Sequence, residues 1–335
     1  MMKNFIVLVV LFIIGGFVWK QFPIVKNIQT KLNSTASTTP TSSSANRIAG
    51  IRKIQKKESI FVPDWNLKDE TILHNGYDRW IYFGGNEKIA TFTGSLKEKE
   101  LWMTIKVTNL DELTLSRSEI SNLENVGQLT KFRGIVLDLE INGLASDEFI
   151  RQINEGVKKL YQEVKKKNLK FAVGVYGDTF FRKRPVNLEF INKNSDEIMV
   201  MAYDFSKSYG EPGPNYPYSE FKRMVSDFLK FVPAEKLTFV FGMYGYDWRL
   251  KDGKPLGTAG ALTLSQIKKN FLGKKCYEKN CVVSTDEDSK EKHVTYEDEA
   301  THSIYFEDVE SAGIKIKYLK EWGIGSVAYW AWGYF

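Results

Sequence analysis

Apolar residues in this chain fall into short runs separated by polar stretches, and the run Phe132–Glu140 carries the clearest pattern. Its aliphatic stretch has the length of one strand and predicts a strand buried on both faces, as in parallel sheets. Because side chains alternate along a strand, Val136, Asp138 and Glu140 share one side and the intervening aliphatic residues share the other. One face is therefore apolar throughout, and the other ends in two carboxyl groups.

The position of Asp138 and Glu140 at the end of this strand suggests a functional site. An unpaired carboxylate is too costly to bury, so the acidic face must meet water, a ligand or a partner. Parallel α/β folds place their chemistry at the C-terminal ends of their strands. The alternative is that the two acids only mark where the strand leaves the core.

Strand-like runs recur through the chain from about Lys57 onward, with helix-like segments between them. The helical spacing is clearest in Asp147–Lys167, and Phe221–Phe231 and Val309–Trp322 behave similarly. Eight strands with interleaved helices predict an α/β fold, the (β/α)₈ TIM barrel. The predicted strands are Ser59–Val62, Arg79–Phe83, Leu101–Val107, Gly134–Leu139, Lys170–Tyr176, Glu197–Tyr203, Leu237–Tyr244 and Gly325–Trp330.

The segment from about Lys251 to Thr301 is too long for a simple connection between strands seven and eight. We expect it to form a small lobe at the catalytic rim of the barrel. The mixed charges of Asp286–Lys292 predict a solvated hairpin. Cys276 and Cys281 are spaced for a small disulfide-closed loop, although two free thiols fit the sequence as well.

The N-terminal region differs from the rest in composition. An apolar run, Phe5–Trp19, with no Ala-x-Ala cleavage site after it predicts an uncleaved membrane anchor within residues 1–22. Residues 23–56 contain a Ser/Thr-rich stretch and predict a flexible linker to a domain at 57–335. A hydrated tether suits a domain outside the cytoplasmic membrane, which is the location we expect. Three lysines that follow the anchor oppose this orientation under the positive-inside rule.

Charge and histidine content exclude several functions. Residues 1–57 hold nine Lys or Arg and no acid, which leaves 38 basic against 41 acidic groups in the rest of the chain. Nucleic acid is therefore not an expected partner. The chain has three histidines with no ligand-like grouping, so we expect neither a metal nor a cofactor. We also expect a monomer.

Acidic and aromatic residues gather where the predicted strands end. Carboxylates can accept hydrogen bonds from sugar hydroxyls, and aromatic rings suit the C–H faces of a sugar, so the cluster indicates a carbohydrate ligand. A single tryptophan is more often a packing residue than a sugar platform. The rim residues are Asp64, Trp65, Tyr176, Asp178, Tyr203, Asp204, Tyr244, Tyr246, Asp247, Trp248, Trp330 and Trp332.

Four motifs, in order, resemble glycoside hydrolase family 18, the chitinase-like barrels. Phe132–Glu140 is similar to the family's Asp-x-x-Asp-x-Asp-x-Glu signature, and Met201–Asp204 to its Met-x-Tyr-Asp motif. Met243–Trp248 and Gly323–Trp330 resemble its seventh and eighth strands. His302–Asp308, with Ser311 and Lys315, resembles the segment before the last strand in the spore-germination and cell-wall branch of the family. The resemblance runs from about Ile60 to Gly333.

This resemblance implies a mechanism and a set of site residues. Glu140 would be the acid/base, and Asp138 would orient the substrate's own acetamido group, which attacks the anomeric carbon. Tyr203 would hydrogen-bond the acetamido oxygen. The other residues expected to bind substrate are Met201, Asp204, Tyr244, Asp247, Trp248, Trp330, as the floor under the sugar, and Trp65.

The signature is incomplete, because Arg133 and Val136 stand where the family has its first two aspartates. The loss at Val136 removes an acid that would share a proton with Asp138, so weakened activity or a shifted pH dependence is expected. The preferred function is hydrolysis of an N-acetylated glycan such as peptidoglycan or chitin. A glycan-binding lectin without catalysis is the first alternative, and a structural or protein-inhibitor role is the second.

Overall fold

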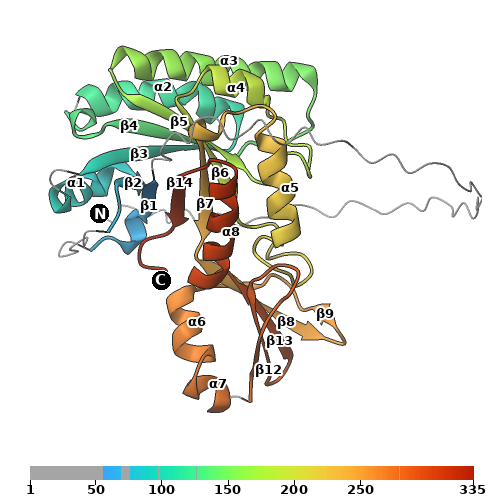
Figure 1. The fold of residues 1–335 in the computed structure, drawn as a ribbon. Helices are drawn as coiled ribbons and strands as arrows, with labels where there is room; N and C mark the ends of the chain where they lie inside the picture. Colours follow the sequence, from blue (N-terminus) through green and yellow to red (C-terminus); the bar gives the residue numbers. More distant parts are fainter. Residues whose placement is uncertain (1–55, 69–75, 97–98, 126, 279) are drawn as a thin grey trace, which may run out of the picture. The chain divides into compact units, whose positions relative to one another are not determined.

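The computed structural model describes residues 56–68, 76–96, 99–125, 127–278 and 280–335, and eight parallel strands in it close into a barrel (Figure 1). Around the barrel the order is β1-β14-β7-β6-β5-β4-β3-β2. The predicted barrel is confirmed, and the strand boundaries differ from the prediction by two residues or fewer. The strands are β1 (Lys57–Pro63), β2 (Arg79–Phe83), β3 (Glu100–Val107), β4 (Gly134–Leu139), β5 (Lys170–Tyr176), β6 (Glu197–Ala202), β7 (Leu237–Gly242) and β14 (Ser326–Trp330).

Helices connect these strands and cover the outside of the barrel. The predicted helix at Asp147–Lys167 is confirmed as α3 (Asp147–Lys166), which begins where the Ser146 side chain accepts a hydrogen bond from the Phe149 amide. The other helical segments are η2 (Asp64–Asn66), η3 (Asn86–Lys88), α1 (Ile89–Ser95), α2 (Leu110–Asn125), η4 (Leu129–Lys131), α4 (Leu188–Lys193), α5 (Tyr218–Phe228), η5 (Ala234–Lys236) and α8 (Val309–Glu321).

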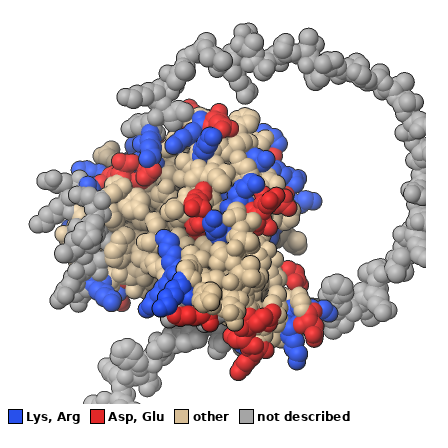
Figure 2. Space-filling model, turned by 60° about the horizontal axis from the view of Figure 1, so that its bottom comes forward, with Lys and Arg blue, Asp and Glu red and all other residues tan. Residues whose placement is uncertain are grey.

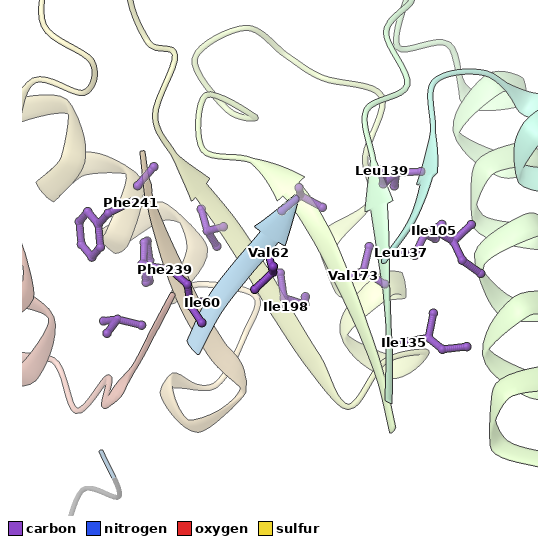
Figure 3. Packing of buried hydrophobic residues seen from close by; sticks show 14 of the residues in the cluster. Ile60, Val62, Ile105, Ile135, Leu137, Leu139, Val173, Ile198, Phe239 and Phe241 are labelled. Atoms are coloured by element: carbon purple, nitrogen blue, oxygen red, sulfur yellow. The ribbon is translucent and has the colours of Figure 1, made fainter. Parts of the chain in front are cut away.

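The alternation predicted for β4 separates two apolar layers. Ile135, Leu137 and Leu139 belong to the large cluster outside the barrel, between the strands and the helices (Figure 3). Val136 belongs instead to a smaller cluster with Trp102, inside the barrel. Asp138 and Glu140 follow Val136 on the inner face, so the fold directs both carboxyl groups to the open C-terminal end of the barrel.

A buried ion pair lies inside the barrel at the opposite, N-terminal end. Arg79, the first residue of β2, donates to both carboxylate oxygens of Glu197, the first residue of β6, at 2.6 and 2.7 Å. Its Nε donates to Ser59 Oγ at 2.9 Å, and its guanidinium lies 4.5 Å from the ring centroid of Trp102. Arg79 is fully buried, and these contacts close this end of the barrel.

The predicted insertion between β7 and the last barrel strand is a separate lobe, seen at the bottom of Figure 1. The lobe begins at Tyr244 and ends at Phe306, whereas the prediction was Lys251 to Thr301. Its start is earlier because Tyr244, predicted as the end of strand seven, is the first residue of the lobe's sheet. Cys276 and Cys281 form a disulfide within it. Its elements are β8 (Tyr244–Lys251), β9 (Lys254–Pro255), β10 (Gly260–Thr263), α6 (Leu264–Phe271), α7 (Lys274–Glu278), β11 (Val282–Thr285), β12 (Lys292–Glu297) and β13 (Thr301–Phe306).

Charges of both signs lie interspersed on the face of the molecule in Figure 2, without one continuous basic surface. The predicted anchor and linker, residues 1–22 and 23–56, lie outside the described residues except for Lys56. Within the described part of the chain, no helix has the length and apolar character needed to cross a bilayer.

Candidate active site

The carboxyl groups of Asp138 and Glu140 lie together where β4 opens at the mouth of the barrel. Asp138 is 8% exposed, whereas a quarter of the Glu140 side chain is exposed. Burial raises the pKa of Asp138 well above its usual value, and the negative charge of Glu140 and a hydrogen bond to it raise this pKa further. Asp138 therefore keeps its proton to a higher pH than an isolated aspartate would.

Lys106, which we did not predict, adds a cation to this pair. Its Nζ lies 2.9 Å from Glu140 Oε1, and it stands opposite Asp138 in the register of β3 and β4. The positive charge of Lys106 opposes the rise in the pKa of Asp138. The sequence held one usable signal: alternation along β3 puts Lys106 on the same face as Trp102 and Thr104, which is the inner face.

Two tyrosines from neighbouring strands complete the centre of the site. The Tyr176 hydroxyl, at the end of β5, donates to Glu140 Oε2 at 3.1 Å. Tyr203 follows β6, and burial raises the pKa of its phenol, with further contributions from the charges of Asp138 and Glu140. Tyr203 thus lies within electrostatic reach of both acids and stays a neutral hydrogen-bonding group.

Asp204 links this centre to the lobe. Its Oδ1 accepts hydrogen bonds from the hydroxyls of Tyr244 and Tyr246 on β8, the second at 2.9 Å. The ring of Tyr244 also lies 6.1 Å from that of Tyr203. The structure therefore brings Asp204 and Tyr244 to the rim beside Tyr203, as the sequence predicts. Met201 lies deeper, buried on the inner face of β6.

Aromatic side chains form one wall of the mouth. Trp330, at the end of β14, packs edge-on against Phe83 with ring centroids 4.8 Å apart. Trp65 follows β1, lies 6.2 Å from Trp330 and is 53% exposed. These rings leave an apolar surface open to a ligand on the side of the barrel where β1, β2 and β14 meet.

Asp247 and Trp248 lie within the lobe and do not join the central group. Asp247 accepts from Tyr296 and lies 2.8 Å from Nδ1 of His302. Trp248 is 1% exposed and donates from Nε1 to the carbonyl oxygen of Gly210 at 3.0 Å. Both side chains have structural partners in this arrangement, so their predicted contact with substrate has no support from the geometry.

The side chain of Val136 is apolar, so it offers no hydrogen bond to the neighbouring hydroxyl of Thr104. Val136 is buried beside Thr104, its register partner on β3. The Thr104 hydroxyl is buried and has no hydrogen-bond partner among the described residues. An aspartate at position 136 would offer an acceptor there, so the inner face of β4 lacks the acid that the family signature has beside Asp138.

A fully buried charge cluster, which the sequence analysis missed, lies between the lobe and the barrel. Lys315 on α8 binds Glu291 at 2.8 Å and also Glu307. Glu291 in turn accepts from the backbone amides of Asn215 and Tyr216 at 2.6 and 2.7 Å. The solvated hairpin predicted for Asp286–Lys292 is therefore wrong at Glu291, which is 0% exposed.

This cluster reaches the active site through Asn215. The Oδ1 atom of Asn215 accepts from the amide of Asp204 at 2.7 Å, and its Nδ2 donates to the carbonyl oxygen of Gly242 at 3.0 Å. Asn215 thus holds the backbone at the ends of β6 and β7. Glu291 positions the Asn215 loop, so the lobe contributes to the placement of Asp204.

We expect the buried cluster to make stability depend on pH through Glu307. Burial raises the pKa of Glu307 from its usual 4.5 to about 7, with Lys315 opposing and Glu291 reinforcing the change. A carboxyl whose pKa is higher in the folded state stabilises the fold fully below 4.5, and this contribution is lost as the pH rises through 7. The advantage of wild type over Glu307→Gln in free energy of unfolding should shrink between pH 5 and 8, by at most about 1.4 kcal/mol per pH unit.

Urea unfolding of both proteins at four pH values measures this difference. Glu297→Gln, at an exposed glutamate of β12, is the matched control and should run parallel to wild type. Parallel curves for Glu307→Gln and wild type would contradict the prediction.

Comparison with known proteins agrees with this fold. The chain is 30% identical over 139 residues to the cortical fragment-lytic enzyme of Bacillus anthracis; the match covers 40% of this chain and 31% of that protein. The match thus spans about a third of the relative's length.

Two solved structures share the barrel. The spore cortex-lytic enzyme SleL of Bacillus cereus has a TM-score of 0.65 at 16% identity, covering 84% of this chain and 71% of that chain. Human YKL-39, a pseudo-chitinase with retained chitooligosaccharide binding properties, has a TM-score of 0.67 at 15% identity, covering 83% and 92%. A family model matches residues 41–334, which is most of the sequence, and the chain belongs to the glycosyl hydrolases family 18.

Proposed function

We propose that this chain is a glycosidase that cleaves N-acetylated glycan by a substrate-assisted, retaining mechanism with Glu140 as acid/base. The observation that carries the proposal is the group formed by Glu140, Asp138 and Tyr203 at the mouth of the barrel, beside the rings of Trp330 and Trp65. Family membership and the name of the Bacillus anthracis relative, cortical fragment-lytic enzyme, support a lytic role on glycan.

In the first step Glu140 donates its proton to the glycosidic oxygen. The carbonyl oxygen of the substrate's acetamido group attacks the anomeric carbon as the bond to the leaving group breaks. Asp138 accepts the acetamido N–H and orients the nucleophile, while Tyr203 donates to the acetamido oxygen. In the second step water attacks the same carbon, the bond from that carbon to the acetamido oxygen breaks, and the water gives a proton to Glu140, so the configuration is retained.

The proton that Glu140 needs is available from its neighbour. In the free site the raised pKa of Asp138 favours a proton on Asp138, while Lys106 pairs with Glu140. A hydrogen bond from the acetamido N–H to Asp138 favours its ionised form and so passes the proton toward Glu140. Because this bond forms only with an N-acetylated sugar, binding and activation are linked.

Incubation of the chain with peptidoglycan fragments and with chitooligosaccharides, followed by mass spectrometry of the products, tests the proposal. Cleavage of either glycan at an N-acetylated sugar is the expected result. Tight binding of both glycans without cleavage between pH 4 and 8 would contradict it.

De-N-acetylated substrate should not be cleaved, even though both acids are intact. The internal nucleophile is the acetamido oxygen, and a free amine cannot replace it. The measurement compares the hydrolysis rate of a chitooligosaccharide with that of its de-N-acetylated counterpart of equal length. Equal rates would exclude the substrate-assisted route while leaving a glycosidase of another mechanism.

A glycan-binding lectin is the second candidate. It is favoured by Val136, where the signature has an acid, and by the ion pair through which Lys106 occupies Glu140 Oε1. Human YKL-39 illustrates that a barrel of this fold can bind chitooligosaccharide as a pseudo-chitinase. The product analysis above separates the two functions.

We further propose that residues 1–22 anchor the chain in the cytoplasmic membrane with the barrel, residues 57–335, outside. The apolar run and the Ser/Thr-rich segment that follows it support this arrangement. Protease added to intact cells should release the domain by cutting between about Asn33 and Ile51. Protection until the cells are lysed would reverse the assignment.

A further inference from the structure

One lysine outside the central group lies beside the active site. Lys207 lies half-buried in the connection between β6 and α5. Among the residues the structure describes, its Nζ makes no ion pair and no hydrogen bond, and it lies 5.6 Å from the ring centroid of Tyr176. Tyr176 is the residue whose hydroxyl donates to Glu140, so this cation lies one side chain away from the proposed acid.

The nearest acids are already occupied. Asp178 is buried and accepts hydrogen bonds from both Arg182 and Arg184. Asp204 accepts from the two tyrosines of β8. Asp178 is thus paired with two cations, whereas the donors to Asp204 are neutral hydroxyls. The charge of Asp204 therefore still acts on Lys207, although the two side chains form no ion pair among the described residues.

The surroundings make this charge costly. Burial lowers the pKa of Lys207. The charges of Asp204 and Asp178 raise this pKa without offsetting burial, and the weaker effects of Arg184 and Arg182 lower it further. The guanidinium of Arg184 also lies over the ring of Tyr176, 4.2 Å from its centroid. A partly desolvated cation without a partner is stabilised by any anion that enters the site.

Exposed aromatic rings lie next to these cations. Phe181 is 55% exposed and packs against Phe205 with centroids 4.9 Å apart, and Arg182 lies over both rings. This wall stands on the side of β5 and β6, away from Trp65 and Trp330. Aromatic rings thus lie on both sides of the acids, and those beside β5 and β6 have Arg182 and Arg184 over them.

We propose that Lys207 binds a carboxylate carried by the glycan, so that this site prefers an acidic N-acetylated glycan to a neutral one. This rests on the proposed function. The carboxylate forms an ion pair with the Lys207 ammonium while the adjoining sugar lies along Tyr176 and Phe181. The carboxylate has two sources, the lactyl ether of a muramyl sugar or a stem peptide attached to it, and both present the same chemistry.

The test compares three substrates of equal length. These are a peptide-free muramyl glycan with its lactyl carboxylate, a peptide-bearing muramyl glycan and a neutral chitooligosaccharide. Lys207→Met should lower kcat/KM about 10- to 100-fold for the carboxylated glycans, mainly through KM, since a hydrogen bond to a charged group is lost. Activity on the neutral glycan should change less than about twofold, which also shows that the variant is folded. Lys207→Arg should recover part of the loss.

Methyl esterification of the lactyl carboxylate gives a complementary measurement. The kcat/KM of wild type should fall by the same factor when the glycan is esterified, and the kcat/KM of Lys207→Met should not fall further. The reason is that esterification and the substitution remove the same interaction. Loss on only one of the two carboxylated glycans identifies the source of the carboxylate. Lys254→Met, at an exposed lysine of β9, controls for the change in net charge and should not alter the preference.

Two results would overturn the inference. One is an equal loss on neutral and carboxylated glycans, which would make Lys207 a support for Tyr176. The other is no loss on any of them. Calorimetric affinities of wild type and Lys207→Met for the carboxylated and neutral glycans give the same comparison without turnover, so the inference remains testable if the chain cleaves neither glycan and the proposed function fails.

Discussion

Glu140→Gln is expected to lower the rate of glycan hydrolysis by about 10²–10⁴-fold while glycan affinity stays close to that of wild type. The amide keeps the shape of the side chain and can still accept from Tyr176, but it has no proton to give to the glycosidic oxygen. Steady-state kinetics on the best substrate, together with calorimetric binding of the same glycan, measures the two quantities separately.

Asp138→Asn provides the comparison. It should also slow turnover, because the amide cannot supply the charge that orients the acetamido group. Glu155→Gln, at an exposed glutamate of α3, is the control and should be as active as wild type. If Glu140→Gln retained the wild-type rate, Glu140 would not be the acid, and the assignment of this site would fail.

Arg79→Met is expected to lower the free energy of unfolding by about 3–5 kcal/mol. The substitution leaves Glu197 buried at the closed end of the barrel without its bidentate partner, and Glu197 depends on Arg79 to keep its pKa below the usual value against the effect of burial. Denaturant unfolding followed by tryptophan fluorescence gives the change.

The exposed pair Lys193–Glu189 on α4 is the matched control. Its side chains are 68% and 64% exposed, so Lys193→Met should cost less than about 1 kcal/mol. A similar loss in both variants would mean that Arg79–Glu197 behaves as a surface pair. The double variant Arg79→Met with Glu197→Met should recover much of the loss, because no charge is then left unpaired.

The barrel was predictable because most of its strands are short apolar runs with buried side chains on both faces. In β4 the alternation alone assigned Val136 and Asp138 to the inner face, and the structure confirms this. The same reasoning located the acids at the mouth, because the ends of parallel strands meet at one edge.

The buried ion pairs could not be predicted, because they depend on contacts between distant segments that a single sequence does not reveal. Arg79 and Glu197 are 118 residues apart, and nothing local marks them as partners. Glu291 lies in a run of mixed charges that is typical of a solvated turn, yet its partners come from α8 and from the Asn215 loop. The start of β8 at Tyr244 was missed because its first residues continue the aromatic pattern of β7.

The buried carboxylate of Glu291 also limits how the lobe can be exchanged among related barrels. A chimera that replaced residues 244–306 with a shorter loop would leave the Lys315 ammonium and the amides of Asn215 and Tyr216 without their shared acceptor. The loop that fixes Asp204 would then lose its support, although no residue of the barrel had been altered. The lobe is therefore not a transferable module: a functional graft must bring its own acid to this point.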